Sequence, residues 1–247
     1  MLFNTLDSAL DAERAVFIGY DPKEDAAAKM CAASIRRHTT VDDLIIIPVI
    51  RDQLLAYGLF NRPLDPLGST QFSITRFLVP YLMGYRGVGI FFDCDMLITR
   101  DIKEMFDLFD AQYAVQVVKH DYSPKTEVKM GGLPQTTYPR KQWSSVVIYN
   151  CDHPATKQLG KQVVESASPR YLHRFEWLED EQIGSLPLEY NYLVEEQEGS
   201  GELPFNIHHT LGAPLFRDKQ RVEYADLWRD EFRLTFGREF AEHDFIT

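Results

Sequence analysis

The sequence predicts an α/β protein with a mixed, mostly parallel central sheet and helices on both of its faces. Apolar, strand-like runs alternate with amphipathic helical stretches through the first two-thirds of the chain. No internal repeat or low-complexity tract interrupts this alternation, and 247 residues are enough for one large domain. We therefore expect a single domain over 1–247, in which 217–247 form a C-terminal helical extension.

The first elements follow one another without long gaps. Residues 15–20 (AVFIGY) predict a short buried strand that ends in an Asp-Pro turn. A helix over 24–38 follows, with its small and apolar residues on one face. Residues 44–50 (LIIIPVI) predict a second strand, and Pro48 favours an irregular or edge position because proline cannot donate to a strand ladder.

The middle of the chain continues the alternation. Residues 70–83 predict a helix in which Pro80 causes a kink or an early end. The apolar run 88–92 predicts a buried strand, and a helix over about 101–109 follows with Thr99 as its cap.

Two further strands, 113–118 and 144–150, enclose a long segment at 119–142. This segment contains two adjacent glycines and three prolines, so we expect an excursion from the sheet. Long loops inside compact domains are often functional. Residues 195–202 (EEQEGSGE) predict a surface loop, and the aromatic residues of 221–245 recur at the spacing of a packed helix.

Composition excludes several classes of function. A net charge of −11 disfavours a nucleic-acid partner, which would need a wide basic face. The three cysteines, Cys31, Cys94 and Cys151, are widely spaced, which argues against a disulfide framework and fits a reducing compartment. The N-terminus lacks the pattern of a signal peptide, and the longest apolar runs are too short to cross a bilayer. We expect a soluble, cytoplasmic protein without a transmembrane segment.

Two carboxylates, Asp93 and Asp95, follow directly on the predicted strand 88–92. Ligands of open α/β sheets bind beyond the carboxyl ends of the strands, and two carboxylates there can turn toward one divalent cation. Mg²⁺ or Mn²⁺ held in this way is usually shared with the phosphates of a substrate. The alternative is an acidic turn that caps the next helix, which is the commoner reading of an isolated D-x-D motif.

Two enzyme classes use such a pair of aspartates. In haloacid-dehalogenase-type phosphatases the first is a nucleophile, which here would be Asp93, but the motif normally opens the chain and is followed by a threonine where this chain has Leu97. In nucleotide-sugar transferases the pair binds a metal that bridges the donor diphosphate, and it follows the first several strands. Position favours the transferase, and a non-catalytic nucleotide-sugar binder is a third possibility.

Residues 69–106 (STQFSITRFLVPYLMGYRGVGIFFDCDMLITRDIKEMF) resemble the central block of glycosyltransferase family 8, a Ser/Thr-x-x-Arg helix followed by a strand and the D-x-D motif. Members of that family also carry an H-x-x-G motif near the C-terminal end. It is matched here in HHTLGAPLF (208–216), which contains His209 and Gly212. The resemblance implies a GT-A-type fold and a Mn²⁺ (or Mg²⁺) ion bound by Asp93, Asp95 and His209. His208 is the alternative ligand if the register differs by one residue.

The resemblance also implies residues that contact the donor, a nucleotide-diphosphate sugar and in the first place a UDP-sugar. The first strand end would hold the base and ribose, the arginine a phosphate or sugar hydroxyl, and the glycine of H-x-x-G a phosphate. In this numbering these donor-binding residues are Gly19, Tyr20, Asp21, Arg76, Asp93 and Gly212. An acidic-Gln cluster that faces the sugar in the family is matched by the candidate catalytic residues Asp180, Glu181 and Gln182.

The chain departs from the family at two positions. A lysine that follows the H-x-x-G glycine in the family is absent, and Arg217 and Lys219 come slightly later. Trp143 stands where the family has an asparagine before the last strand of the sheet. The donor sugar is therefore not implied by the resemblance.

The function implied by the resemblance is that of a metal-dependent glycosyltransferase of the hexosyltransferase type that retains the anomeric configuration. Its acceptor is not identified and is a glycan, a lipid-linked molecule or a small molecule. We expect acceptor contacts in 119–142 and after residue 217. An anionic acceptor would suit five basic residues in the first of these segments, which are Lys119, Lys125, Lys129, Arg140 and Lys141.

Overall fold

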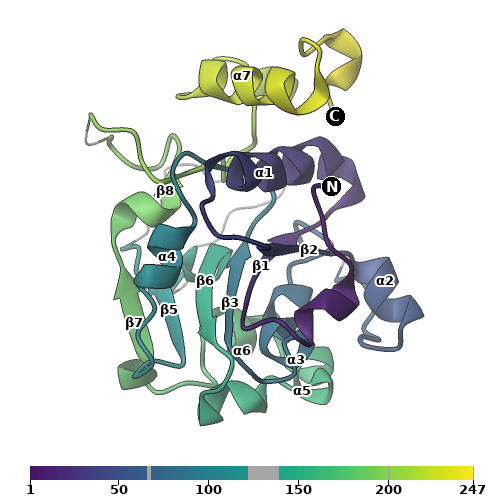
Figure 1. The fold of residues 1–247 in the computed structure, drawn as a ribbon, viewed down its shortest axis with the longest axis vertical. Helices are drawn as coiled ribbons and strands as arrows, with labels where there is room; N and C mark the ends of the chain where they lie inside the picture. Colours follow the sequence, from purple (N-terminus) through teal and green to yellow (C-terminus); the bar gives the residue numbers. More distant parts are fainter. Residues whose placement is uncertain (66–67, 122–138, 200, 247) are drawn as a thin grey trace.

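A computed structural model describes residues 1–65, 68–121, 139–199 and 201–246 (Figure 1). Within these ranges the chain builds a six-stranded central sheet in the order β2-β1-β3-β6-β5-β7. In chain order the strands are β1 (Arg14–Gly19), β2 (Ile45–Val49), β3 (Val88–Phe92), β5 (Val115–Val118), β6 (Val146–Asn150) and β7 (Ile183–Leu186). Strand β2 lies at an edge, as Pro48 predicts.

The sheet is mixed and mostly parallel. Strand β1 pairs in parallel with β2 and β3, and β5 pairs in parallel with β7. Strand β6 runs antiparallel to both of its neighbours, β3 and β5. All strands of this sheet except β6 therefore deliver their carboxyl ends to one edge, where ligands of such sheets bind.

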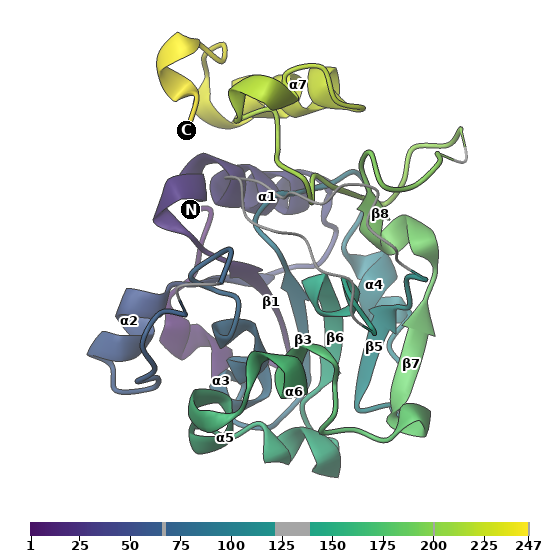
Figure 2. The same ribbon diagram turned by 180° about the vertical axis from the view of Figure 1, so that it is seen from behind.

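Helices cover both faces of the sheet, which confirms the predicted fold class. The two opposed views place α3 (Val79–Leu82), α5 (Lys161–Ser166) and α6 (Pro169–His173) over one face (Figures 1 and 2). The other face is covered by α1 (Asp25–His38) and α4 (Lys103–Asp107). Strands β3 and β6 are buried at every position, because neither face of the sheet is open to solvent.

A second, three-stranded sheet lies beyond β3 and was not predicted from the sequence. Its order is β4-β9-β8, formed by β4 (Met96–Ile98), β8 (Tyr192–Leu193) and β9 (Asn206–His208). Strands of two or three residues carry too little alternation to be recognised by pattern. This small sheet joins the chain just after β3 to a segment more than 100 residues later, since Met96 pairs with His208.

Two predicted helices differ in detail. Residues 70–83 do not form one helix, because a 3₁₀ turn over Thr75–Leu78 leads into α3. Pro80 is the second residue of α3, where a missing N–H costs nothing. Thr99 does not cap α4; its hydroxyl donates to Pro204 O, and the side chain of Asp101 accepts from the N–H of Lys103 instead.

The C-terminal part includes helix α7 (Ala225–Phe236), which lies against α1 at one end of the molecule (Figure 1). Helix α2 (Arg51–Ala56) follows the edge strand β2. The remaining helical turns are of the 3₁₀ type, at Leu6–Ala9, Pro22–Glu24, Trp143–Ser145, Pro154–Gln158, Asp180–Gln182, Leu188–Asn191, Arg217–Lys219 and Glu242–Asp244.

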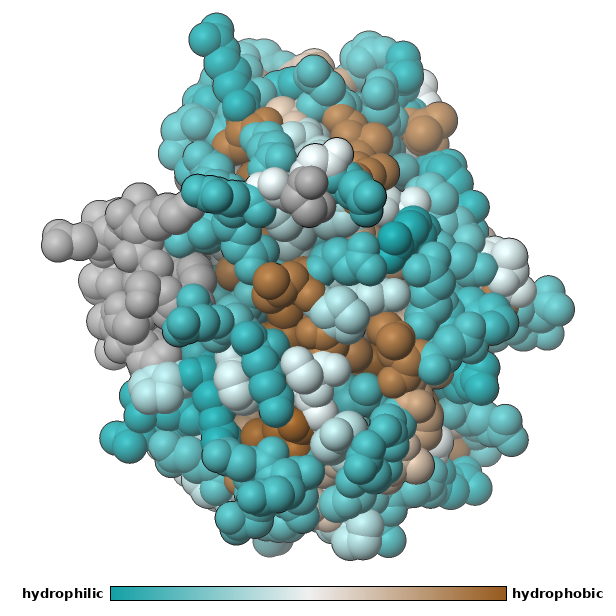
Figure 3. Space-filling view, turned by 90° about the vertical axis from the view of Figure 1, so that its left-hand side faces the viewer, coloured by the Kyte–Doolittle hydropathy of each residue, from teal (hydrophilic) through white to brown (hydrophobic). Residues whose placement is uncertain are grey.

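None of the helices in the described ranges has the length and apolarity that a membrane crossing requires. The side of the molecule that carries β7 is mostly hydrophilic, with apolar side chains gathered near its centre (Figure 3). Exposed large apolar residues of the described chain include Leu188, which follows β7, and Leu203.

Candidate metal centre

Asp93 and Asp95 lie in the short connection between β3 and β4. The N–H of Asp93 donates to Ser145 O at 3.1 Å, and the carbonyl oxygen of Asp95 accepts from the N–H of His209 at 3.1 Å. These bonds fix the turn to β6 on one side and to β9 on the other. The two carboxylates are consequently held at the carboxyl edge of the sheet, with only 16% and 12% of their side chains exposed.

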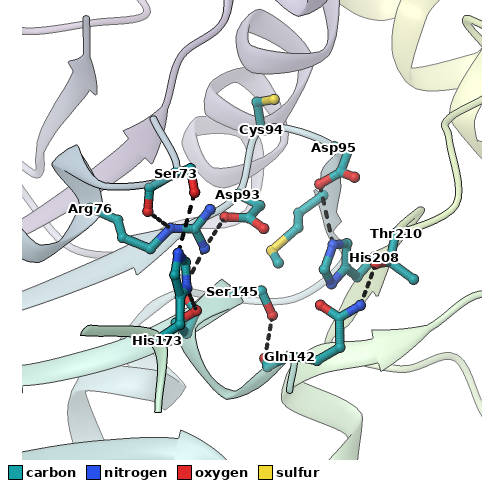
Figure 4. A network of polar contacts seen from close by, with 12 residues as sticks. Ser73, Arg76, Asp93, Cys94, Asp95, Gln142, Ser145, His173, His208 and Thr210 are labelled. Atoms are coloured by element: carbon teal, nitrogen blue, oxygen red, sulfur yellow. Dashed lines mark hydrogen bonds and ion pairs between the residues drawn. The ribbon is translucent and has the colours of Figure 1, made fainter. Parts of the chain in front are cut away.

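The imidazole that joins these carboxylates is that of His208. Potential ligand atoms of Asp93, Asp95 and His208 all lie within 4.8 Å of one another. His208 Nε2 is 3.3 Å from Asp95 Oδ1, and the two side chains point toward each other (Figure 4). Because side chains alternate along a strand, the pairing of Met96 with His208 in β4 and β9 aims His208, and not its neighbour, at the aspartates.

His209, the ligand expected from the H-x-x-G motif, is not brought into this group. Its ring is buried, and neither ring nitrogen has a hydrogen-bond partner within the described residues. Burial lowers the pKa of His209 to about 4. The choice between adjacent histidines that the sequence left open therefore falls, by geometry, on His208.

Arg76 holds Asp93 in place. Its Nη1 lies 2.8 Å from Asp93 Oδ1 and also donates to Ser144 O at 2.8 Å. The guanidinium is buried and lies over the rings of Phe72 and Phe91, at 5.3 and 5.1 Å from their centroids. The sequence predicted a contact with phosphate or sugar for Arg76, whereas the structure shows a buried ion pair with a proposed metal ligand.

Burial makes this group of acids electrostatically unfavourable without a cation. It raises the pKa of Asp93 to about 6, with Asp95 adding to the rise and Arg76 opposing it. Glu24, at the end of the 3₁₀ turn after β1, is also buried nearby. Burial, followed by the charges of Asp95 and Asp21, raises the pKa of Glu24 to about 8.

The donor atoms fit a divalent metal. The buried Oδ1 atoms of Asp93 and Asp95 lie near an arginine and a histidine, but accept no well-aligned hydrogen bond from the described residues. Two carboxylates and one imidazole form a ligand set that suits Mn²⁺ and accommodates Mg²⁺. A cation between these groups would satisfy the buried oxygens and offset their mutual repulsion.

The residues predicted for the nucleotide lie at the same edge, because Ile18 of β1 is in register with Phe92 of β3. Tyr20 donates its hydroxyl proton to Asp25 at 2.9 Å, and burial raises the pKa of Tyr20 to about 12. The buried Asp21 accepts from the N–H groups of Lys23 and Gln71, both at 3.0 Å.

Gly19 has a packing role at this edge. A Cβ atom on Gly19 would come within 2.4 Å of the ring of Phe72. A side chain at this position therefore conflicts with the packing of Phe72, and the glycine is explained by this contact alone.

Gly212 lies in the turn after β9. Its φ of 116° is in the region that favours glycine, and its N–H donates to His209 O at 2.7 Å. The basic residues that follow are engaged within the chain: Lys219 Nζ lies 2.8 Å from Glu195 Oε2, and Arg217 pairs with Glu242.

The predicted catalytic residues Asp180, Glu181 and Gln182 lie at the opposite edge of the sheet from Asp93. They precede β7, and Gln182 O accepts from the N–H of Ala114 at the start of β5. Asp180 is 80% exposed and pairs with Arg140. The structure does not bring these three residues together with the aspartates.

Most of the segment predicted to contact the acceptor, including Lys125 and Lys129, lies outside the described residues. At its two ends the basic side chains have internal contacts. Lys119 Nζ donates to Ile183 O at 2.7 Å, Arg140 Nη1 donates to Arg174 O at 2.7 Å, and Lys141 is buried. Trp143 donates from its indole nitrogen to His120 O at 3.1 Å.

Sequence reasoning missed the polar residues behind His208. Asn191 Oδ1 lies 2.8 Å from His208 Nδ1, and Asn191 Nδ2 lies 2.8 Å from Ser145 Oγ and 3.0 Å from His120 Nε2. All four residues are buried. An asparagine between two tyrosines in LEYNYL matches no motif, so only the fold identifies it.

Comparison with known proteins gives one close relative and several distant structures. No protein-family model matches the chain. Protein CDI of Arabidopsis thaliana is 45% identical over 221 residues, which covers 87% of this chain and 85% of that protein.

Several solved structures of similar fold are glycosyltransferases. GlyE of Streptococcus pneumoniae TIGR4 superimposes with a TM-score of 0.59 at 12% identity, covering 91% of this chain and 63% of GlyE. The chain thus spans less than two-thirds of the length of GlyE. The galactosyltransferase LgtC, solved with donor and acceptor sugar analogues, gives 0.55 at 11% identity, covering 93% and 98%. Identities this low show the fold, which is the GT-A type that the sequence predicted.

Proposed function

The chain belongs to the family of Protein CDI of Arabidopsis thaliana, and for this member we propose the activity of a metal-dependent glycosyltransferase. The donor is a nucleotide-diphosphate sugar, in the first place a UDP-sugar, and the cation is Mn²⁺ or Mg²⁺. The observation that carries the proposal is the convergence of Asp93, Asp95 and His208 at the carboxyl edge of a GT-A-type sheet. The resemblance of residues 69–106 to glycosyltransferase family 8 also supports the proposal.

The chemistry follows from the leaving group. A nucleoside diphosphate gains negative charge as its bond to the sugar breaks, and a divalent cation at the diphosphate would stabilise that charge. Asp93, held by Arg76, and Asp95, opposite His208, would keep the cation at one place relative to the end of β1. Tyr20 and Asp21 at that strand end are where we propose that the nucleotide lies.

Three finer statements belong to the same proposal. Transfer is of the hexosyltransferase type with retention of the anomeric configuration, and the acceptor is a glycan, a lipid-linked molecule or a small molecule. A cytoplasmic location is supported by Cys31, Cys94 and Cys151, all of which are free and buried. The NMR spectrum of the first-formed product would decide between retention and inversion.

The phosphatase alternative has less support. It requires Asp93 as a nucleophile, but Oδ1 of Asp93 lies 2.8 Å from Arg76 in a buried ion pair. A phosphoryl group on Asp93, trapped with a phosphate analogue, would favour it. A nucleotide-sugar binder without catalysis differs from the transferase by the absence of turnover.

The first experiment measures UDP release from a panel of UDP-sugars, with Mn²⁺ and with EDTA. We expect release from one sugar, abolished by EDTA and reduced by more than about 100-fold in Asp95→Asn, which removes one ligand charge at constant shape. Asp107→Asn is the matched control, because Asp107 is 57% exposed and pairs with Lys103 on helix α4.

Each negative result has its own meaning. Thermal stabilisation by UDP and Mn²⁺ without release from any donor would favour the non-catalytic binder. No release and no stabilisation by any nucleotide sugar would contradict the proposal.

A further inference from the structure

The two ring nitrogens of His208 face different groups. Nε2 lies 3.3 Å from Asp95 Oδ1, and Nδ1 lies 2.8 Å from Asn191 Oδ1. A neutral imidazole carries one proton, and only the nitrogen without it can bind a cation. The position of that proton therefore decides whether His208 can serve as a ligand toward the aspartates.

Ser145 and Gln142 favour one orientation of the Asn191 amide. The hydroxyl of Ser145 has a single proton, which it donates to Gln142 O at 2.7 Å (Figure 4). The Asn191 atom at 2.8 Å from Ser145 Oγ must then be a donor, so it is Nδ2. The same atom lies 3.5 Å from Gln142 O, which also calls for a donor.

With Nδ2 of Asn191 turned to Ser145, the amide oxygen faces His208. An amide oxygen only accepts, so His208 must donate from Nδ1. The lone pair of Nε2 then points at Asp95, in the direction where the cation would lie. The fixed end of this relay is a backbone carbonyl, that of Gln142, which cannot change its role.

His120 is the second ring that faces the amide of Asn191. Its Nε2 and Nδ1 lie 3.0 Å from the amide nitrogens of Asn191 and Gln197. Burial lowers the pKa of His120 to about 4, so its ring carries one proton at pH 7. Gln197 Oε1 accepts from the N–H of Leu193 at 2.8 Å, so Gln197 donates to His120 Nδ1 and the proton of His120 lies on Nε2. That proton competes with the oxygens of Ser145 and Gln142 for the orientation of the Asn191 amide, and we give precedence to the two oxygens.

We propose that Ser145 and Asn191 are positioning residues that keep the proton of His208 on Nδ1 and so leave Nε2 free to bind the divalent cation. The cation itself rests on the proposed function. Without the amide of Asn191, Asp95 is the acceptor that still faces the ring. The proton then moves to Nε2, where it blocks the ligand position.

The test begins with metal-free, ¹⁵N-histidine-labelled protein. Long-range ¹H–¹⁵N correlation spectra distinguish a protonated from an unprotonated ring nitrogen, with His208 assigned through His208→Gln. We expect the proton on Nδ1 in the unmodified protein and on Nε2 in Asn191→Leu. Asn191→Asp, which keeps an acceptor at the same place, should retain the proton on Nδ1.

The matched control is Asn206→Leu. Asn206 is equally buried, lies two residues before His208 in β9, and donates to Tyr190 O rather than to the histidine. This variant loses a buried amide of the same size, so it reports the purely structural effect. We expect the tautomer of His208 to be unchanged in it.

Mn²⁺ affinity, measured by electron paramagnetic resonance of the free ion, is the second readout. We expect Asn191→Leu to weaken Mn²⁺ binding on the order of 10- to 100-fold, and Asn191→Asp and Asn206→Leu to leave it nearly unchanged. A proton on Nε2 in the unmodified protein, an unchanged tautomer in Asn191→Leu, or a changed tautomer with unchanged affinity would overturn the inference. An Nδ1 proton in a protein that binds no Mn²⁺ would instead count against the proposed function.

Discussion

Arg76 forms an ion pair with Asp93, which differs from the phosphate or sugar contact that the sequence predicted. Its guanidinium contacts Asp93, Ser144 O and two aromatic rings, so its interactions lie within the interior of the site. Removing one member of a buried ion pair leaves the other charge unpaired, which costs more than the pair contributes. The main task of Arg76 is therefore to hold Asp93 ionised and oriented.

Arg76→Ala should lower the free energy of unfolding of the metal-free protein by about 3–5 kcal/mol in urea denaturation. Adding Asp93→Asn to this variant should restore part of the loss, because no buried charge then remains. Arg86→Ala, at an exposed position where the arginine donates to Leu10 O, is the control. A loss of less than about 1 kcal/mol in Arg76→Ala would contradict the role assigned to the ion pair.

Helix α7 shows how an element far along the chain docks by its apolar face. Trp228 and Phe232 are buried and pack against Met30 of α1, together with Ala213 and Leu215. Arg37 Nη2 of α1 lies 2.8 Å from Glu231 Oε1 beside this contact. The prediction of a packed C-terminal helix and the observed helix therefore share one cause, the spacing of aromatic residues along a single face.

Phe232→Ala should loosen α7 from α1. Removing this ring leaves a cavity that costs about 3–5 kcal/mol. Backbone amides of α7 should then exchange faster with deuterium, while those of β3 stay protected. Leu234→Ala is the control on the same helix, since Leu234 is 58% exposed. Unchanged protection of α7 in Phe232→Ala would show that this packing does not hold the helix.

Four acidic side chains gather at one edge of the central sheet. Asp21 and Glu24 follow β1, and Asp93 and Asp95 follow β3, so two parallel strands deliver four carboxyl groups to one edge. Folding raises the pKa of Glu24 further than that of Asp93, and the Glu24 side chain also accepts from the thiol of Cys94 at 3.6 Å. Such a cluster makes the stability of the metal-free protein depend on pH.

The direction of this pH dependence follows from the pKa of Glu24, which folding raises from 4.5 to about 8. Between these values the unfolded chain loses the proton that the folded protein keeps, so stability falls as pH rises from about 4.5 to about 8. Glu24→Gln removes this dependence. In urea denaturation with EDTA, the free energy of unfolding of Glu24→Gln should exceed that of the unmodified protein by a margin that grows between pH 5 and pH 8. We expect this margin to grow by up to a few kcal/mol.

Glu13→Gln is the control for this measurement, because Glu13 is exposed. An advantage of Glu24→Gln that is the same at both pH values would contradict the raised pKa of Glu24.

The sequence alone determined the α/β class, most of the strands of the central sheet and the place of Asp93 and Asp95. These features depend on local patterns: strands and helices show their periods, and a strand end marks the residues that emerge from it. It did not determine β4, β8 or β9, which have two or three residues each and exist only through pairing with one another.

Tertiary structure decided everything that joins distant segments. The choice of His208 over His209 depends on the register between β4 and β9, and a shift by one residue would reverse it. The pairing of Arg76 with Asp93, the placement of Asp180 at the far edge and the contact of Asn191 with His208 depend on how strands are ordered in space. The physical reason is that the sequence gives the type of each side chain, whereas tertiary packing sets the distances between side chains that are far apart in the chain.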